Sequence, residues 1–151
     1  MMDRRALALD RLRSYNTMCV AAENLRGQIK LLKLHQERLH AVRTDRVVVC
    51  GQADGREDKL LDNILHRQEL EASLESTLQW IHITQRALGV LENEELMILR
   101  KLYIQERPGT IAQLCQLLMV EKSSIYRKRD KALEKFTMAL FGAESKKPIG
   151  G

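Results

Sequence analysis

The chain has 151 residues, of which 44% are hydrophobic, 30% are charged and only 4% are aromatic. This length suits one domain, or one small domain with an extended helical region, and the composition favours a folded and mainly helical protein. The net charge of +5 favours an acidic partner. Because no stretch is apolar enough to span a bilayer and the N-terminus lacks the apolar core of a signal peptide, we expect a cytoplasmic protein with no membrane partner.

The first predicted element is a long helix from residue 3 to about residue 42. Its apolar side chains and a few others repeat at alternating steps of three and four residues, which is typical of a helix packed along another helix. The repeating residues are Leu12, Tyr15, Cys19, Ala22, Leu25, Ile29, Leu32, His35, Leu39 and Val42.

Residues 43–56 interrupt this helical pattern. Val47–Val48–Val49–Cys50 has strand propensity, and Gly51 and Gly55 favour turns around it. We expect a short extended segment or hairpin here. It either packs on the chain's own helices or is covered by a partner subunit.

A second long helix is predicted from about residue 57 to residue 88, with Trp80 at the border of its apolar stripe. The stripe consists of Leu61, Ile64, Leu65, Leu74, Leu78, Ile81 and Leu88. The simplest arrangement folds this helix back antiparallel on the first one. Two helices alone leave part of each stripe exposed, so we expect a homo-oligomer, with a dimer favoured.

Residues 92–140 contain three shorter predicted helices. One covers 92–105 and ends before the turn at Pro108–Gly109. The next begins at Thr110 and shows one apolar face, and a longer helix starts near Ser123–Ser124 after a break at Met119–Val120–Glu121. The apolar residues of the last two helices are Ile111, Leu114, Cys115 and Leu118, and then Ile125, Ala132, Leu133 and Phe136.

The other sides of the last helix are basic. They carry Lys122, Arg127, Lys128, Arg129, Lys131 and Lys135 against only Asp130 and Glu134. A short helix, a tight turn and a longer basic helix form the pattern of a helix-turn-helix, whose second helix is shaped for the major groove of DNA.

Sequence features of catalysis and metal binding are missing. Cys19, Cys50 and Cys115 share no CxxC spacing, so we expect reduced thiols that pack as small hydrophobic side chains. The four histidines, His35, His40, His66 and His82, lack partners at metal-ligand spacing. There is no Gly-rich phosphate loop and no GxSxG turn. We therefore expect no enzyme activity, no metal and no cofactor.

The block from Thr110 to Leu140 resembles region four of bacterial sigma factors. The residues that carry this resemblance are Thr110, Leu114–Cys115, Leu118, Val120, Ile125, Arg127 and Ala132–Leu133–Glu134–Lys135–Phe136, and the segment ENEELMILRKLYIQ at 92–105 matches the same families. Two positions depart from the pattern. Met119 stands where such turns usually carry Gly, because the position often needs a positive φ, and Glu121 replaces the usual Ser or Thr cap.

Upstream, VVVCGQADGREDKLLDNILHRQELEASL at 47–74 resembles the mid-section of phage late-gene regulators of the ArpU/RinA type. These small proteins pair an N-terminal helical region with a sigma-like helix-turn-helix. The resemblance implies a phage or prophage regulator of late or packaging genes that binds double-stranded DNA at a promoter in the bacterial host cell. It either replaces a sigma region on RNA polymerase or acts as an independent activator.

The resemblance also assigns roles to individual residues. It places Lys122, Ser123, Ser124, Tyr126 and Arg127 at the N-terminal end of the recognition helix, near base edges, and Arg127 suits a bidentate contact to guanine. Further along, Arg129, Lys131 and Lys135 are expected to bind phosphates. Thr110, as the cap of the support helix, would present backbone N–H groups to a phosphate.

We thus predict an all-α protein with a long antiparallel helical hairpin followed by a sigma-like helix-turn-helix domain. The hairpin covers 1–91 with its loop at 43–56, the DNA-binding domain covers 92–142, and a flexible tail covers 143–151. Two alternatives stay open. One is a DNA-packaging recognition protein of the small-terminase kind, for which we expect a ring of many subunits. The other is an adaptor whose long helices bind protein.

Overall fold

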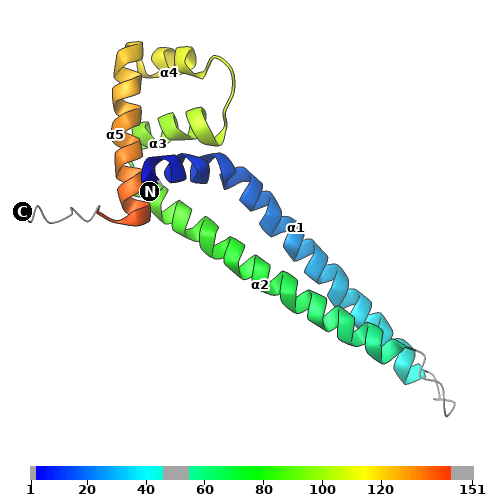
Figure 1. Ribbon diagram of the computed structural model, residues 1–151. Coiled ribbons are helices and arrows are strands. Elements are labelled where there is room, and N and C mark those ends of the chain that lie inside the picture. Colours follow the sequence, from blue (N-terminus) through cyan, green and yellow to red (C-terminus); the bar gives the residue numbers. More distant parts are fainter. Residues whose placement is uncertain (1–2, 46–54, 144–151) are drawn as a thin grey trace, which may run out of the picture. The chain divides into compact units, whose positions relative to one another are not determined.

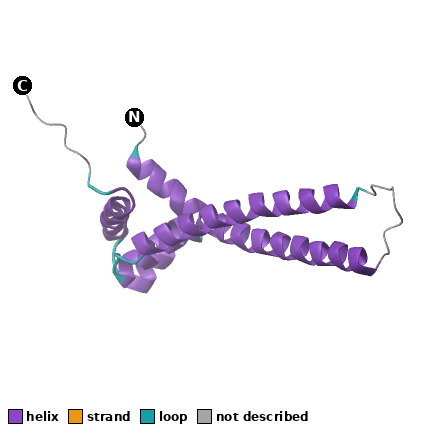
Figure 2. Cartoon of the chain, turned by 90° about the horizontal axis from the view of Figure 1, so that it is seen from below, coloured by secondary structure: helices purple, strands orange, loops and turns teal. Residues whose placement is uncertain are grey.

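The computed structural model describes residues 3–45 and 55–143, and within these ranges the protein is all-α, as predicted (Figures 1 and 2). The elements are α1 (Arg4–Asp45), α2 (Arg56–Leu88), α3 (Asn93–Leu99), the π-helical turn η1 (Arg100–Ile104), α4 (Thr110–Leu118) and α5 (Lys122–Phe141). None of these described helices is long and apolar enough to cross a membrane. The predicted extended segment at 47–50 and the predicted tail beyond residue 143 lie outside the described residues.

The chain forms two compact units. Unit 1 combines the residues up to Met18 with those from Trp80 onward, and unit 2 spans Cys19–Gln79. This division differs from the predicted boundary between residues 91 and 92. The first turns of α1 and the last turns of α2 belong to unit 1, because they share a hydrophobic core with α5.

In unit 2, α1 and α2 lie side by side and make polar contacts through their facing sides (Figure 2). The Asn63 side chain donates a hydrogen bond to the carbonyl of Leu32 at 3.1 Å, and the Arg67 guanidinium donates one to the side chain of Gln36. Each of these hydrogen bonds satisfies one polar group where the two helices meet, and leaving such a group unpaired costs about 1–3 kcal/mol. These contacts therefore help to fix the register of the two helices.

The predicted apolar stripes are partly wrong in unit 2. Leu61 and Leu65 were placed on the buried side of α2, but they are 54% and 49% exposed, and His35 of α1 is exposed as well. The less exposed positions of α2 follow a seven-residue repeat through Leu60, Asn63, Arg67, Leu70 and Leu74. Because Asn63 and Arg67 are polar, the spacing of apolar side chains did not predict this repeat.

The main core of unit 1 lies where α1, α2, α3 and α5 meet. Its buried residues are Ala8, Leu12, Ala87, Leu88, Leu91, Leu99, Ala132, Leu133 and Phe136. Burial of a Leu or Phe side chain contributes about 1.5–3 kcal/mol, so this cluster holds α5 firmly against the other helices. The predicted apolar stripe of α5 is buried as expected.

A smaller core joins α4 to α5. Ile98 of α3, Leu114 of α4 and Ile125 of α5 are fully buried there. Around them pack the partly buried residues Leu102, Ile111, Cys115, Leu118 and Val120. The predicted apolar face of α4 therefore packs against α5, and three residues connect the two helices.

The connection between α4 and α5 contains a strained residue. Met119 has a φ of 54° and a ψ of 45°, in the left-handed region, and is the one non-glycine residue with positive φ in the described parts of the chain. A side chain in this conformation costs about 1–2 kcal/mol. Met119 therefore adopts the conformation for which such turns usually carry Gly, although the sequence has no glycine here. Glu121 is the N-cap of α5 as expected, but its side chain makes no capping hydrogen bond.

The helix predicted at 92–105 is divided in the structure. It begins after the N-cap Glu92 as the α-helix α3, and from Arg100 it continues as the π-helical turn η1. The amide of Gln105 closes this turn by donating to the carbonyl of Arg100 at 2.7 Å, five residues back. Such a wider turn leaves no clear trace in the spacing of apolar residues, so the sequence did not predict it.

Replacement of Met119 by glycine should stabilise the protein. Because the Met119 side chain is 90% exposed, its removal loses little packing. We expect Met119→Gly to raise the free energy of unfolding by about 0.5–1 kcal/mol, after the entropy of glycine is subtracted from the relieved strain. Urea denaturation measures this change. Met119→Ala is the matched control, because it removes the same side chain but keeps a Cβ. Equal free energies of unfolding for Met119→Gly and Met119→Ala would show that the backbone of Met119 is not strained.

Candidate nucleic-acid interface

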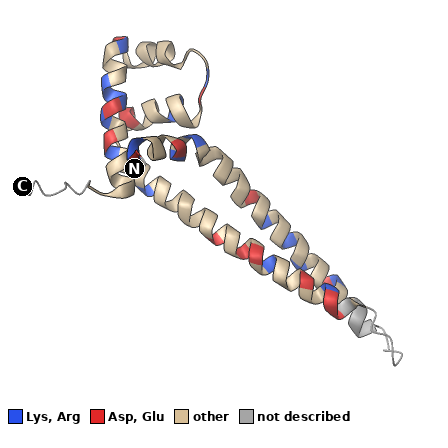
Figure 3. Ribbon diagram, viewed as in Figure 1, with Lys and Arg blue, Asp and Glu red and all other residues tan. Residues whose placement is uncertain are grey.

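The orientation of α5 divides its side chains into an inner and an outer side. Successive residues of an α-helix are rotated by about 100°, so the buried side chains define the inner side. The outer side of α5, opposite to them, carries Ser123, Arg127, Lys131 and Glu134, all of which are exposed. Figure 3 shows basic residues along α5 and at the start of α1.

Three of the predicted DNA contacts lie on this outer side. Ser123, Arg127 and Lys131 face solvent within the first three turns of α5. Ser124 is half-buried, and its hydroxyl accepts a hydrogen bond from the Arg127 guanidinium at 3.3 Å. This contact places the guanidinium close to the N-terminal end of α5, which in a helix-turn-helix is the end that meets base edges.

Tyr126 and two cations form one edge of the outer side. The Cζ atom of Arg129 lies 4.9 Å from the centroid of the Tyr126 ring, and the Nζ atom of Lys122 lies 6.0 Å from it. Cations over an aromatic face are attracted to the negative face of the ring. The predicted residues Lys122, Tyr126 and Arg129 are therefore brought together.

On the opposite edge, two lysines of α5 pair with acids of α3. The Nζ atom of Lys135 lies 2.9 Å from Oε1 of Glu95, and Lys128 pairs with Glu94. The amide of Glu92 also donates to Oε1 of Glu95, at 3.1 Å. Lys135, which the sequence analysis expected to bind phosphate, is thus engaged within unit 1.

The pKa values of Glu95 and Lys135 are shifted by the groups that contact them. Burial raises the pKa of Glu95, whereas the hydrogen bonds from Lys135 and from the Glu92 amide lower it, and the resulting pKa lies below the ordinary value of 4.5. The hydrogen bond to Glu95 in turn raises the pKa of Lys135 above 10.5. Both groups are therefore charged at neutral pH, and they fasten α3 to α5.

Thr110 does not cap α4, contrary to the prediction. The N-cap is Gly109, which has a φ of 77°, and Thr110 is already the first helical residue. Because glycine adopts this conformation without strain, the chain turns into α4 one residue earlier than expected. Thr110 is buried, and its hydroxyl donates to the carbonyl of Arg107. It lines a polar cleft together with Lys101, Arg107 and Gln113.

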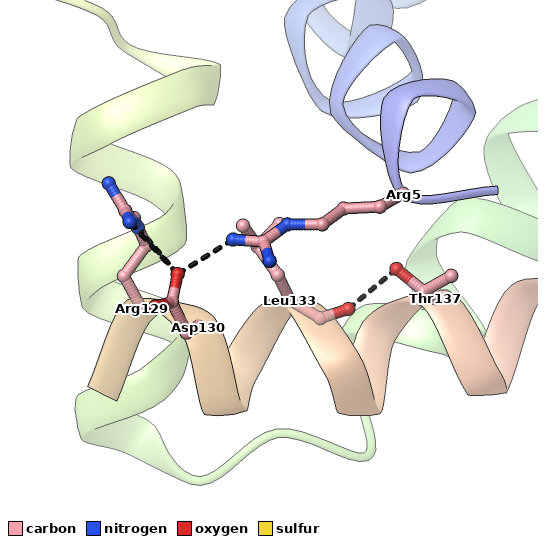
Figure 4. Close-up of polar contacts among 5 residues, drawn as sticks. All are labelled: Arg5, Arg129, Asp130, Leu133 and Thr137. Carbon is pink, nitrogen blue, oxygen red and sulfur yellow. Dashed lines mark hydrogen bonds and ion pairs between the residues drawn. The ribbon is translucent and has the colours of Figure 1, made fainter. Parts of the chain in front are cut away.

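The structure adds a residue that the sequence analysis did not single out. Arg5, in the first turns of α1, places Nη2 2.6 Å from Oδ1 of Asp130, and Arg129 donates to the same oxygen from Nη2 at 2.9 Å and from Nε at 3.1 Å (Figure 4). The hydrogen bonds from Arg129 and from Arg5 lower the pKa of Asp130 below its ordinary value. The sequence shows a basic start, but it contains no signal that Arg5 lies beside α5.

Comparisons with models of protein families, with curated proteins and with solved structures found no match to this chain. The resemblance to sigma region four and to phage late-gene regulators therefore stays a prediction from the sequence. What supports a function is the arrangement of charge on α5 and beside it.

Removal of the Glu95 charge should weaken the attachment of α3 to α5. Because the folded-state pKa of Glu95 is lowered, its stabilisation is present above about pH 4.5 and is lost as the pH falls through the folded-state pKa. We expect Glu95→Gln to lower the free energy of unfolding at pH 7 by about 1–3 kcal/mol and to flatten its dependence on pH below 4.5. Chemical denaturation between pH 3 and pH 7 measures both effects.

Glu94→Gln is the matched control, because it removes the same charge from a half-exposed ion pair with Lys128. Exposed pairs contribute only about 0.2–1 kcal/mol. A loss from Glu95→Gln no larger than that of the control would contradict the structural role assigned to Glu95.

Proposed function

We propose that this protein binds double-stranded DNA in a sequence-specific way through α5 and regulates transcription of phage or prophage genes. The observation that supports this most is the outer side of α5. It combines exposed hydroxyl, guanidinium and ammonium groups in the first three turns, while the apolar side of the same helix is buried in two cores. A short helix and a three-residue turn precede it, as the major-groove binding mode requires.

The side chains divide between two kinds of DNA contact. Arg127 is exposed near the start of α5, and its planar guanidinium matches the O6 and N7 acceptors of guanine. Lys131 lies one turn further along and suits a phosphate, as does the edge formed by Lys122 and Arg129. We assign Lys135 instead to the attachment of α3, because its ammonium group is held by Glu95.

The regulatory part of the proposal rests on the resemblance found in the sequence. A sigma-like region brings RNA polymerase to a promoter, so RNA polymerase is a second proposed partner. Late or packaging genes are the proposed targets, and the cytoplasm of a bacterial host is the proposed compartment.

A second copy of the chain is a further proposed partner. The outer faces of both long helices in unit 2 are partly apolar: Leu31 and Leu34 are exposed on α1, and Leu61 and Leu65 are exposed on α2. The charges around them are of opposite sign. Lys30 and Arg38 flank the α1 pair, and Asp58, Asp62 and Glu69 flank the α2 pair. This complementarity favours contact between α1 of one copy and α2 of another.

The proposed DNA contact by Arg127 leads to a test. Fragments of the source genome that the protein retains give a preferred duplex, and a shuffled version of it gives the reference. We expect Arg127→Ala to weaken binding to the preferred duplex by about 1–3 kcal/mol and binding to the shuffled one much less. Fluorescence anisotropy titrations at fixed salt measure both. Arg26→Ala, an exposed arginine of unit 2, is the control. Equal losses on both duplexes would make Arg127 a phosphate contact.

Introduction of a charge on the outer apolar faces of unit 2 tests self-association. We expect sedimentation equilibrium to show a dimer or larger oligomer that Leu31→Asp or Leu65→Lys weakens at least tenfold. A dimer favours the transcriptional role, and a ring of many subunits favours DNA packaging. Val90→Asp is the matched control. Val90 is 57% exposed, which is similar to the exposure of Leu31 and Leu65, but it belongs to unit 1 and not to these faces. A wild-type monomer, or an equal effect of the control, would contradict the proposed contact.

A further inference from the structure

We propose that Arg5 and Arg129 form a phosphate-binding site of the DNA interface outside the helix-turn-helix, and that Asp130 occupies this site until a DNA phosphate replaces it. The inference rests on the proposed function and deepens it. It assigns a DNA contact to the first turns of α1, a part of the chain that the sequence analysis placed in a separate helical hairpin.

Two guanidinium groups converge at this site. Arg5 and Arg129 are far apart in the sequence, yet three N–H donors from them reach one oxygen of Asp130 within 2.6–3.1 Å (Figure 4). Charge-assisted hydrogen bonds from guanidinium groups are strong, and they suit phosphate oxygens as well as carboxylate oxygens. One carboxylate balances only one of the two cations, so the group keeps a net positive charge.

The two arginines and Asp130 lie next to the proposed recognition residues of α5. Asp130 follows Arg127 by three residues, which places both on the same part of the α5 surface. Arg129 also stacks on Tyr126, and Lys122 approaches the same ring. Lys122, Arg129 and Arg5 therefore form a row of cations from the first turn of α5 to the start of α1, with Asp130 between the two arginines.

The exposure of these side chains suits a contact to phosphate and not to base edges. Side chains about half exposed, as those of Arg5 and Asp130 are, remain accessible to a ligand. The Arg129 side chain is only 26% exposed and is held between Tyr126 and Asp130, so it is poorly placed to search a groove for base edges. Fixed cations at the margin of a recognition helix position the backbone of the duplex and carry no sequence information.

Asp130 then acts as a competitor of the phosphate. In the free protein it holds both guanidiniums in place, and its charge opposes the approach of DNA. Loss of this charge should increase binding to every duplex, whereas loss of Arg5 should decrease it. Each phosphate contact contributes about 0.9 to the slope of log K against log salt concentration, so both effects depend on salt.

The experiment compares Arg5→Gln, Asp130→Asn and the double variant in anisotropy titrations with a shuffled duplex from 50 to 200 mM salt. We expect Arg5→Gln to make the salt slope shallower by about 0.9, and Asp130→Asn to strengthen binding about threefold or more at 200 mM salt. In the double variant the gain from Asp130→Asn should shrink, because one of the two released cations is missing. Arg26→Gln, which changes the net charge equally from unit 2, should leave the slope unchanged.

The outcomes separate the two proposals. If the wild-type protein binds no duplex at any of these salt concentrations, the proposed function fails. If it binds and Arg5→Gln leaves the slope unchanged, the phosphate site fails while the proposed function stands. Strictly additive effects in the double variant would also overturn the site, because a general effect of net charge needs no shared contact. Thermal melting of each variant establishes whether it is folded. We expect all variants to fold, because an exposed ion pair contributes no more than about 1 kcal/mol to stability.

Discussion

The arrangement of this protein depends on the burial of one side of α5. Ala132, Leu133 and Phe136 pack against Ala8 and Leu12 of α1 in the main core of unit 1. At its other end, α5 is held by the smaller core that it shares with α3 and α4. Two separate cores on one helix prevent rotation about its axis. A rotation by a single residue, about 100°, would expose Phe136 and bury charged side chains, at a cost of several kcal/mol.

Electrostatic pairing then decides which cations remain available. The acids of α3 bind Lys128 and Lys135, and Asp130 binds Arg129 and Arg5. Arg127 and Lys131 are left on the outer side of α5. Of the two exposed acids of this helix, Asp130 is already paired with Arg5 and Arg129, and Glu134 lies beside Lys131. The same helix thus uses two lysines on one edge to attach α3, while Arg127 and Lys131 face solvent. Paired and unpaired cations look alike in the sequence, so only the structure separates them.

Much of unit 1 was predictable from the sequence, because local rules dominate there. The apolar spacing in α5 predicted its buried residues, whereas the positive φ of Met119, which stands where such turns usually carry Gly, was not predicted. Features that depend on contacts between distant residues were not predictable. The proximity of Arg5 to Asp130 and the pairing of Lys135 with Glu95 follow from tertiary packing. In unit 2, polar residues such as Asn63 stand on the facing side, so hydrophobicity alone gave the wrong register.

We propose above all that the outer side of α5 lies against duplex DNA. The most direct measurement is an NMR titration of the isotope-labelled chain with the preferred duplex, recorded for backbone amides and arginine side chains. The account predicts that the largest shifts occur at Ser123, Arg127 and Lys131, with smaller ones at Arg5 and Arg129 and almost none at the buried Leu114. Shifts confined to α1 and α2 of unit 2, with the outer side of α5 unchanged at saturating DNA, would contradict it.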